Sequence, residues 1–174
     1  WNMDSTGYRL PTEAEWEHAA RAGGAHGGNL PGEAPLSEQG WYGKNAQRRP
    51  QRVGQMLSNR WGLHDLVGNV WEWCNDWYDG SYYSSSPGSD PAGPDSGATR
   101  VPRGGGWSSV AGYCRVANRN FNYPDYRSSS GGFLVLTLLR FQLLNPLGSL
   151  VEQLVNRSHL VDGVTGLLLG CEDH

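Results

Sequence analysis

The chain has 174 residues, a formal net charge of −3 and a pI near 5.9. Its length suits one domain with a real core better than two domains. The balance of charge offers no basic surface for phosphate backbones, which argues against nucleic-acid binding. Eight Trp, eight Tyr, 25 Gly and 10 Pro describe a loop-rich fold with an aromatic core and argue against disorder.

The first strong element is a helix within residues 10–24, "LPTEAEWEHAARAGG". Thr12 and Glu15 make a capping box, and Gly23 and Gly24 end the helix. Its apolar side is formed by Ala14, Trp16, Ala19 and Ala20. Residues 25–60 show no sustained periodicity and are predicted to form long surface loops with one short strand near Val53.

Residues 61–78, "WGLHDLVGNVWEWCNDWY", are rich in tryptophan. We expect Trp71, Trp73 and Trp77 to form the aromatic centre of the core, because they cannot all face solvent in a soluble domain. A turn-rich loop of about twenty residues follows, of a length that is usually functional or mobile inside a domain.

Two strands and a helix are predicted in the second half of the chain. "TRVPRGGGW", residues 99–107, predicts a short strand entering a glycine turn, and "GGFLVLTLL", residues 131–139, a strand buried on both faces. Apolar residues from Leu147 to Val155 recur at helical spacing, which predicts a C-terminal amphipathic helix. Arg140 interrupts the most apolar stretch after seven residues, so no membrane span is expected.

Cys74, Cys114 and Cys171 lack zinc or redox spacing, so free, partly buried thiols are predicted, with a Cys74–Cys114 disulfide as the alternative. The chain begins with Trp1 rather than Met, which is consistent with fusion to an upstream domain, and the compartment is left open.

No motif for catalysis stands out. The histidines are scattered, the serine runs lack a nucleophile elbow, and "RGGGW" lacks the pattern of a phosphate loop. Oxygen ligands do gather near Asn69 and Glu72, from Asn75, Asp76 and Asp79. A calcium site there is one interpretation and surface hydrogen bonding is the other; no other cofactor is expected.

The segments "GYRLPTEAEWEHAAR", "WGLHDLVGNVWEWCNDWY", "RVPRGGGW" and "GGF", in this order over about residues 7–135, resemble the formylglycine-generating enzyme family, also called sulfatase-modifying factor domains. The resemblance implies an α+β, C-type-lectin-like fold of the formylglycine-generating enzyme type, irregular and loop-rich, with a small twisted antiparallel sheet. The expected domain covers residues 1–137, with the first part of the usual family domain missing or shortened. Residues 138–174 would form a C-terminal extension with the amphipathic helix.

The resemblance also bears on activity. Formylglycine-generating enzymes use two cysteines, a few residues apart near the end of the domain, to hold copper(I). This chain offers only Cys114, with Ser109 or Val110 at the partner position, and a single thiolate would hold copper(I) poorly. The iron-dependent sulfoxide synthases of the same fold need a His-rich motif in an upstream domain, which these residues do not supply. We therefore predict that the chain is not an enzyme.

A third branch of the family matches better. Residues 103–133 resemble, without a gap, the variable proteins of diversity-generating retroelements, whose templates read RGGSW, NNNANNCRSANRNNNNPDNRNNNN and GF. Most residues at the template's Asn positions are reachable from an Asn codon by changing adenines alone, which can never give Lys, Glu, Gln, Met or Trp. Those five types supply 25 of the 174 residues but none in 108–131. Val116, where the template has Ser, agrees least well with this comparison, because a Val codon there needs a different starting codon.

The sequence thus predicts a non-catalytic display protein with a hypervariable ligand-binding face, and an unknown protein or glycan as partner. Tyr and Phe would give contact area, and Ser, Gly and Asn adaptable hydrogen bonding. Alternatives are an oxidase that modifies sulfatases and a non-binding structural module of a larger signalling protein. The predicted binding residues are Ser108, Ser109, Val110, Gly112, Tyr113, Val116, Asn118, Asn120, Phe121, Asn122, Tyr123, Tyr126, Ser128, Ser129, Ser130 and Gly131. The predicted fixed anchors are Trp107, Cys114, Ala117, Arg119, Pro124 and Phe133.

Overall fold

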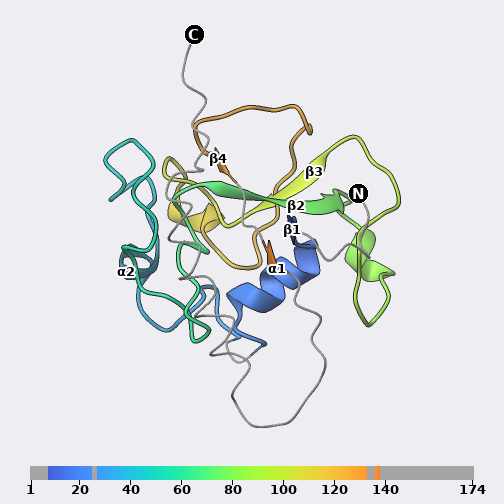
Figure 1. The fold of residues 1–174 in the computed structure, drawn as a ribbon, viewed down its shortest axis with the longest axis horizontal. Coiled ribbons are helices and arrows are strands. Elements are labelled where there is room, and N and C mark those ends of the chain that lie inside the picture. Colours follow the sequence, from blue (N-terminus) through green and yellow to red (C-terminus); the bar gives the residue numbers. More distant parts are fainter. Residues whose placement is uncertain (1–7, 25–26, 133–135, 138–174) are drawn as a thin grey trace.

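The computed structural model describes residues 8–24, 27–132 and 136–137. Short elements are joined by long loops (Figure 1). In chain order they are β1 (Tyr8–Arg9), α1 (Glu13–Ala20), α2 (Leu36–Gln39), β2 (Trp71–Trp77), the 3-10 turn η1 (Tyr82–Ser84), β3 (Arg100–Arg103), the 3-10 turn η2 (Ala111–Tyr113), β4 (Gly131–Gly132) and β5 (Leu136–Thr137).

β2 is the central strand of a three-stranded sheet. β3 pairs with it antiparallel, with Glu72 opposite Arg103, and β4 pairs with it parallel, with Glu72 opposite Gly132. The sheet is therefore mixed, and the expectation of an antiparallel sheet was wrong in this respect. Because both edges of β2 are used, the two ends of segment 103–132 are held at the same residue, one on each side.

Helix α1 forms where the sequence predicts it. The Glu15 N–H donates to Thr12 Oγ1 at 3.2 Å, and the Thr12 N–H donates to Glu15 Oε2 at 2.8 Å, which confirms the capping box. The Glu15 carboxylate also accepts two hydrogen bonds from Arg9, at 2.6 and 2.7 Å. These contacts tie the start of the helix to β1.

The core lies between α1 and the sheet, with Trp16 at 0% exposure. Around it pack Leu66, Val67, Cys74, Val101, Cys114 and Val116. Cys74 and Cys114 are buried free thiols, as predicted. In Figure 1, α1 and the loop that precedes β4 lie on opposite sides of β2.

The side chains of β2 are arranged differently from the prediction. Burial alternates along the strand, and the buried positions are Glu72, Cys74 and Asp76. Trp71, Trp73 and Trp77 are only partly buried, so their placement at the centre of the core was wrong. The physical reason is that the core side of β2 faces Trp16, whose indole N–H donates to Glu72 Oε2 at 2.6 Å. The three indoles therefore lie on the other face.

Other differences concern the strands. The region of Val53 is a turn rather than a strand, and the Val53 side chain is exposed. Of the strand expected over 131–139, the structure describes two parts, β4, which pairs with β2, and β5, which pairs with β1. Phe133, the C-terminal helix, Cys171 and the extension 138–174 lie outside the described residues. Within the described ranges, no helix is long and apolar enough to cross a membrane.

Candidate functional site

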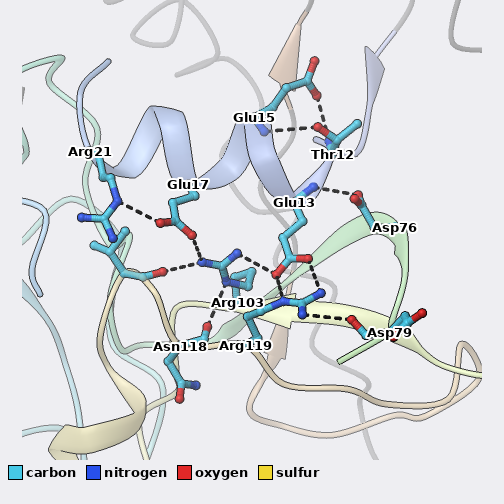
Figure 2. A network of polar contacts seen from close by, with 11 residues as sticks. Thr12, Glu13, Glu15, Glu17, Arg21, Asp76, Asp79, Arg103, Asn118 and Arg119 are labelled. Carbon is cyan, nitrogen blue, oxygen red and sulfur yellow. Dashed lines mark hydrogen bonds and ion pairs between the residues drawn. The ribbon is translucent and has the colours of Figure 1, made fainter. Parts of the chain in front are cut away.

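A buried arginine holds segment 103–132 against helix α1 (Figure 2). Arg103 Nη1 donates to Glu13 Oε1 at 2.8 Å, and Nη2 donates to Glu17 Oε2 at 2.6 Å. Arg103 also donates to two backbone carbonyls, those of Val116 at 2.5 Å and Asn118 at 2.9 Å. Its polar groups thus join the helix to the backbone of segment 103–132.

A second arginine extends this network. Arg119 donates from Nε and Nη2 to the two carboxylate oxygens of Glu13, at 2.7 and 2.8 Å, and from Nη1 to the Asp79 carbonyl at 3.0 Å. Its guanidinium lies 5.0 and 4.9 Å from the ring centroids of Tyr78 and Tyr83. Burial alone would lower the pKa of Arg119, but the hydrogen bonds and charge of Glu13 raise it. Arg119 therefore stays charged and fixes the middle of the segment.

The glycine turn after β3 has no room for side chains. Gly104 and Gly105 have φ angles of 89° and 84°, which favour glycine. A Cβ on Gly105 would lie 2.8 Å from Cys114 Sγ. The turn is closed by a hydrogen bond from the Gly106 N–H to Ser109 Oγ at 3.0 Å. The short strand that enters a glycine turn, predicted for residues 99–107, is confirmed.

Most of the predicted binding residues reach solvent. Nine are exposed: Ser108, Val110, Gly112, Tyr113, Phe121, Tyr123, Tyr126, Ser129 and Gly131. Six are partly buried: Ser109, Asn118, Asn120, Asn122, Ser128 and Ser130. Val110, Tyr113, Phe121, Tyr123 and Tyr126 are more than half exposed, which is unusual for large apolar or aromatic side chains. We call the fifteen residues of these two groups the variable face, after the variation that the sequence predicts for them.

Val116 is an exception, and its inclusion among the binding residues was wrong. It is 0% exposed and belongs to the hydrophobic core. Its N–H donates to the Asn29 carbonyl at 2.8 Å, and its own carbonyl accepts from Arg103. A side chain with no surface cannot contact a ligand.

The five predicted anchors with described positions divide into two groups. Cys114 is fully buried, Arg119 lies in the ion network, and the partly buried Trp107 donates from its indole to the Ser129 carbonyl at 3.2 Å. Ala117 and Pro124 are exposed, so neither acts as an anchor through burial. The sixth anchor, Phe133, has no described position.

Part of the variable face closes a small pocket against the sheet. The pocket has a volume of about 160 Å³ and is lined by Trp71, Trp73, Pro102, Asn120, Asn122, Tyr126, Ser128, Ser130 and Gly131. Sequence reasoning did not assign Trp71 and Trp73 to the site. The available signal was the alternation Trp-Glu-Trp-Cys-Asn-Asp-Trp, which places all three indoles on one face of a strand.

Calcium near Asn69 and Glu72 stays a hypothesis. The Asn69 amide exchanges hydrogen bonds with the Gln51 backbone at 2.9 and 3.1 Å. Burial raises the pKa of Glu72 to about 8, although the hydrogen bond from Trp16 opposes the shift. Within residues 8–24, 27–132 and 136–137, no three His, Cys, Asp or Glu side chains are grouped as metal ligands.

The residues around Cys114 do not fit a two-thiolate copper(I) site. Burial raises the pKa of Cys114 to about 11, which favours the thiol over the thiolate that binds metal. At the partner positions, the Ser109 hydroxyl accepts from Gly106, and Val110 is an exposed apolar side chain. The other described cysteine, Cys74, has a pKa raised well above the usual value of a thiol, again mainly by burial.

Comparison with known proteins identifies the family. The sulfatase-modifying factor enzyme 1-like domain matches residues 2–138. The formylglycine-generating enzyme of Streptomyces coelicolor is 41% identical over 156 residues, covering 76% of this chain and 49% of that protein. The serine/threonine-protein kinase Pkn1 of Chlamydia trachomatis is 40% identical, covering 73% of this chain and 20% of the kinase. The chain thus spans about half the length of the formylglycine-generating enzyme it matches.

Among solved structures, Treponema denticola variable protein 1 superposes with a TM-score of 0.67 and 38% identity, over 76% of this chain and 48% of that one. The small mixed sheet, the few helices and the long loops agree with this likeness. The fold is the C-type-lectin-like fold of the formylglycine-generating enzyme type, and the chain belongs to the sulfatase-modifying factor enzyme 1-like domain family.

Proposed function

We propose that this chain is a non-catalytic display domain. Its variable face binds a ligand through non-covalent contacts, and adenine-directed retroelement mutagenesis rewrites that face. The observation that carries the proposal is the separation between side chains and backbone in segment 103–132. Fifteen of the predicted residues reach solvent, whereas the Val116 and Asn118 carbonyls are held by Arg103, which lies outside that set.

A domain whose exposed side chains are replaced from variant to variant needs this separation, because its backbone must keep its position. Arg103 contacts the carbonyl oxygens of residues 116 and 118, and every residue type has such a carbonyl. Arg119 is held by Glu13 of helix α1 and by the Asp79 carbonyl. Replacing the exposed side chains would therefore leave the network that positions the loop in place.

The chemistry of the variable face suits recognition. Tyr113, Phe121, Tyr123 and Tyr126 present large rings with few rotatable bonds, which bury much surface at little entropic cost. The surrounding Ser and Asn side chains supply adaptable hydrogen bonds. The likeness to a structure named as a variable protein supports the same reading.

A second candidate is an oxidase of the formylglycine-generating type. It is favoured by the 41% identity to the Streptomyces coelicolor enzyme. The buried, protonated Cys114 thiol and the absence of a second thiol at residues 109 and 110 speak against it. Stoichiometric copper(I) binding, together with oxygen consumption in the presence of a thiol peptide, would establish this activity instead.

A third candidate is a structural module of a longer protein. It is suggested by the match to the kinase Pkn1, because the aligned segment makes up only 20% of that kinase. Such a module would bind nothing through the variable face, and selection from a library of that face would yield no binders.

Two matched libraries test the proposal. In the first, Tyr113, Phe121, Tyr123 and Tyr126 take the residues reachable by adenine changes; in the second, four buried positions, Leu66, Val101, Cys114 and Val116, take the same residues. We expect most members of the first library to resist protease and most of the second to be digested. Selection of the first library on two unrelated purified proteins, lysozyme and serum albumin, should yield binders to at least one. Equal loss of folding in the two libraries would refute a rewritable face.

The origin of the variation has its own test in the DNA around the gene. We expect a near-copy of the codons for 103–133 that differs only where the copy carries adenine, close to a reverse-transcriptase gene. Without such a copy the face could still bind a ligand, but it would not be rewritten in this way.

A further inference from the structure

The size of the pocket between β2 and the variable face limits the kind of ligand group that it can hold. Its volume of about 160 Å³ is well below the roughly 300 Å³ at which pockets begin to hold a drug-sized molecule. It therefore has room for one ring or one side chain of a larger ligand. The remainder of the ligand would extend over the variable face.

One wall of the pocket is aromatic and belongs to the fixed part of the domain. Trp71 and Trp73 lie on the same face of β2, and Trp73 is opposite Pro102 of β3 in the sheet register. The Trp71 N–H donates to the Ser130 carbonyl at 2.7 Å, and its indole meets the Tyr113 ring edge-on at 6.3 Å. These contacts hold Trp71 beside the polar residues that line the rest of the pocket.

The rim consists of uncharged polar groups with free hydrogen-bonding capacity. Among the described residues, the Asn122 amide and the Tyr126 hydroxyl have no hydrogen-bond partner. The Asn120 Oδ1 accepts from Phe121, whereas its Nδ2 has no acceptor. The Ser128 and Ser130 hydroxyls are 2.9 Å apart and bond to each other. Residues with donors and acceptors thus share the lining with the two tryptophans, and no charged side chain lines the pocket.

We propose that this pocket binds one uncharged sugar ring of a glycan ligand. The C–H face of a pyranose ring would pack on the indoles, and its hydroxyls would pair with the amides of Asn120 and Asn122 and with the Tyr126 hydroxyl. A hydrocarbon side chain would satisfy the wall but leave these polar groups desolvated and unpaired. A carboxylate or an ammonium group would find no countercharge in the lining.

This proposal rests on the display function and assigns different roles to the fixed and to the rewritten residues of the pocket. Trp71, Trp73 and Pro102 lie outside the rewritten positions, so stacking on the wall would be kept in every variant. Asn120, Asn122 and Tyr126 are rewritten positions, so the pattern of hydrogen bonds would change from variant to variant. Rewriting would then alter which sugar is chosen while preserving the preference for sugar rings.

The test is an array of neutral and acidic glycans probed with the full chain and with two tyrosine variants. We expect binding to at least one neutral glycan, with quenching of tryptophan fluorescence. Tyr126→Phe removes only the hydroxyl at the rim and should weaken that binding roughly five- to tenfold, the usual effect of losing one such hydrogen bond. Tyr83→Phe is the matched control, because Tyr83 is 43% exposed, lies outside the variable face and does not line the pocket. It should leave binding unchanged, and neither change should shift the melting temperature.

The outcomes separate this proposal from the function on which it rests. If no neutral glycan binds, or if the two tyrosine variants weaken binding equally, the sugar pocket is wrong. If the libraries yield protein binders while the array stays empty, the display function stands and its ligand is a protein. If the libraries fail to fold and no glycan binds, both proposals fall.

Discussion

Arg103 and Glu13 form an ion pair, Nη1 to Oε1, of 2.8 Å in which each side chain is only 1% exposed. The two residues come from β3 and from the first turn of α1, and Glu13 also binds Arg119. A buried pair of this kind adds little net stability compared with apolar residues, but removing Glu13 would leave two arginines with less countercharge, since Arg103 would keep only Glu17. The pair therefore joins β3 to α1 at the base of segment 103–132.

Replacing Glu13 by Gln should be strongly destabilising. The change keeps the shape of the side chain but leaves Arg103 and Arg119 without their shared countercharge, so we expect a loss of about 3–5 kcal/mol in the free energy of unfolding. Urea denaturation followed by tryptophan fluorescence measures this. Glu33→Gln is the matched control, because the Glu33–Arg60 pair is 3.9 Å long and exposed, and its loss should cost at most about 1 kcal/mol. Similar losses for the two variants would mean that the buried network does not hold the fold.

The buried carboxyl of Glu72 predicts a pH dependence of stability. Burial raises the pKa of Glu72 in the folded protein to about 8, from 4.5 when exposed. The folded state then holds a proton that the unfolded state has lost, so this contribution is complete below pH 4.5 and disappears as the pH rises through 8. Asp76 acts in the same direction, since burial raises its pKa to about 6. Glu15 and Glu17 act oppositely at acid pH, because their ion pairs with arginines outweigh burial and lower their pKa values.

The variant Glu72→Gln isolates this effect. Gln keeps an oxygen to accept from the Trp16 indole and never ionises, so it should lose less stability than the native chain between pH 5.5 and 8.5. One pKa unit corresponds to about 1.4 kcal/mol, and we expect the difference between the two chains to change by at least that much across this range. Urea denaturation at three pH values measures it. Parallel curves for the two chains would show that Glu72 does not titrate in this range.

Local signals explain which parts of this fold were predictable. The capping box of α1 depends on residues three apart, Thr12 and Glu15, and it forms as predicted. The family motifs, read in order, gave the correct fold type. By contrast, Glu13 lies 90 residues from Arg103 and 106 from Arg119 in sequence, and no local pattern joins them.

The orientation of β2 was missed for a different reason. Alternation indicates that Trp71 and Trp73 share a face, but it does not say which face is buried. The rule that large apolar residues lie inside favoured the indoles. In the structure the opposite face of β2 is buried, because Trp16 fills the core side of the strand and donates to Glu72. Val116 was wrongly assigned to the binding residues because the alignment with the template gives sequence positions and says nothing about burial.

The glycine turn after β3 allows a test of scaffold geometry. Gly105→Ala places a Cβ 2.8 Å from Cys114 Sγ at a φ of +84°, so both clash and backbone strain oppose folding. Gly54→Ala is the control, since φ is +74° and nothing lies within 4 Å of the added Cβ. Gly54→Ala should cost about 1 kcal/mol from strain alone, and Gly105→Ala a further 1–3 kcal/mol from overpacking. Thermal unfolding of the two variants gives the difference, and equal costs would show that the turn relaxes away from Cys114.

Two valines six residues apart separate the core of segment 103–132 from its surface. Val116 is 0% exposed, whereas Val110 is 66% exposed. Val116→Ala removes two buried carbon atoms and leaves a cavity, so it should cost about 2 kcal/mol of unfolding free energy. Val110→Ala removes the same atoms from solvent and should change stability by less than about 0.5 kcal/mol. Chemical denaturation of both variants measures the contrast. Should Val110→Ala prove as costly as Val116→Ala, position 110 would be part of the core, and the variable face would lose one of its most exposed apolar contacts.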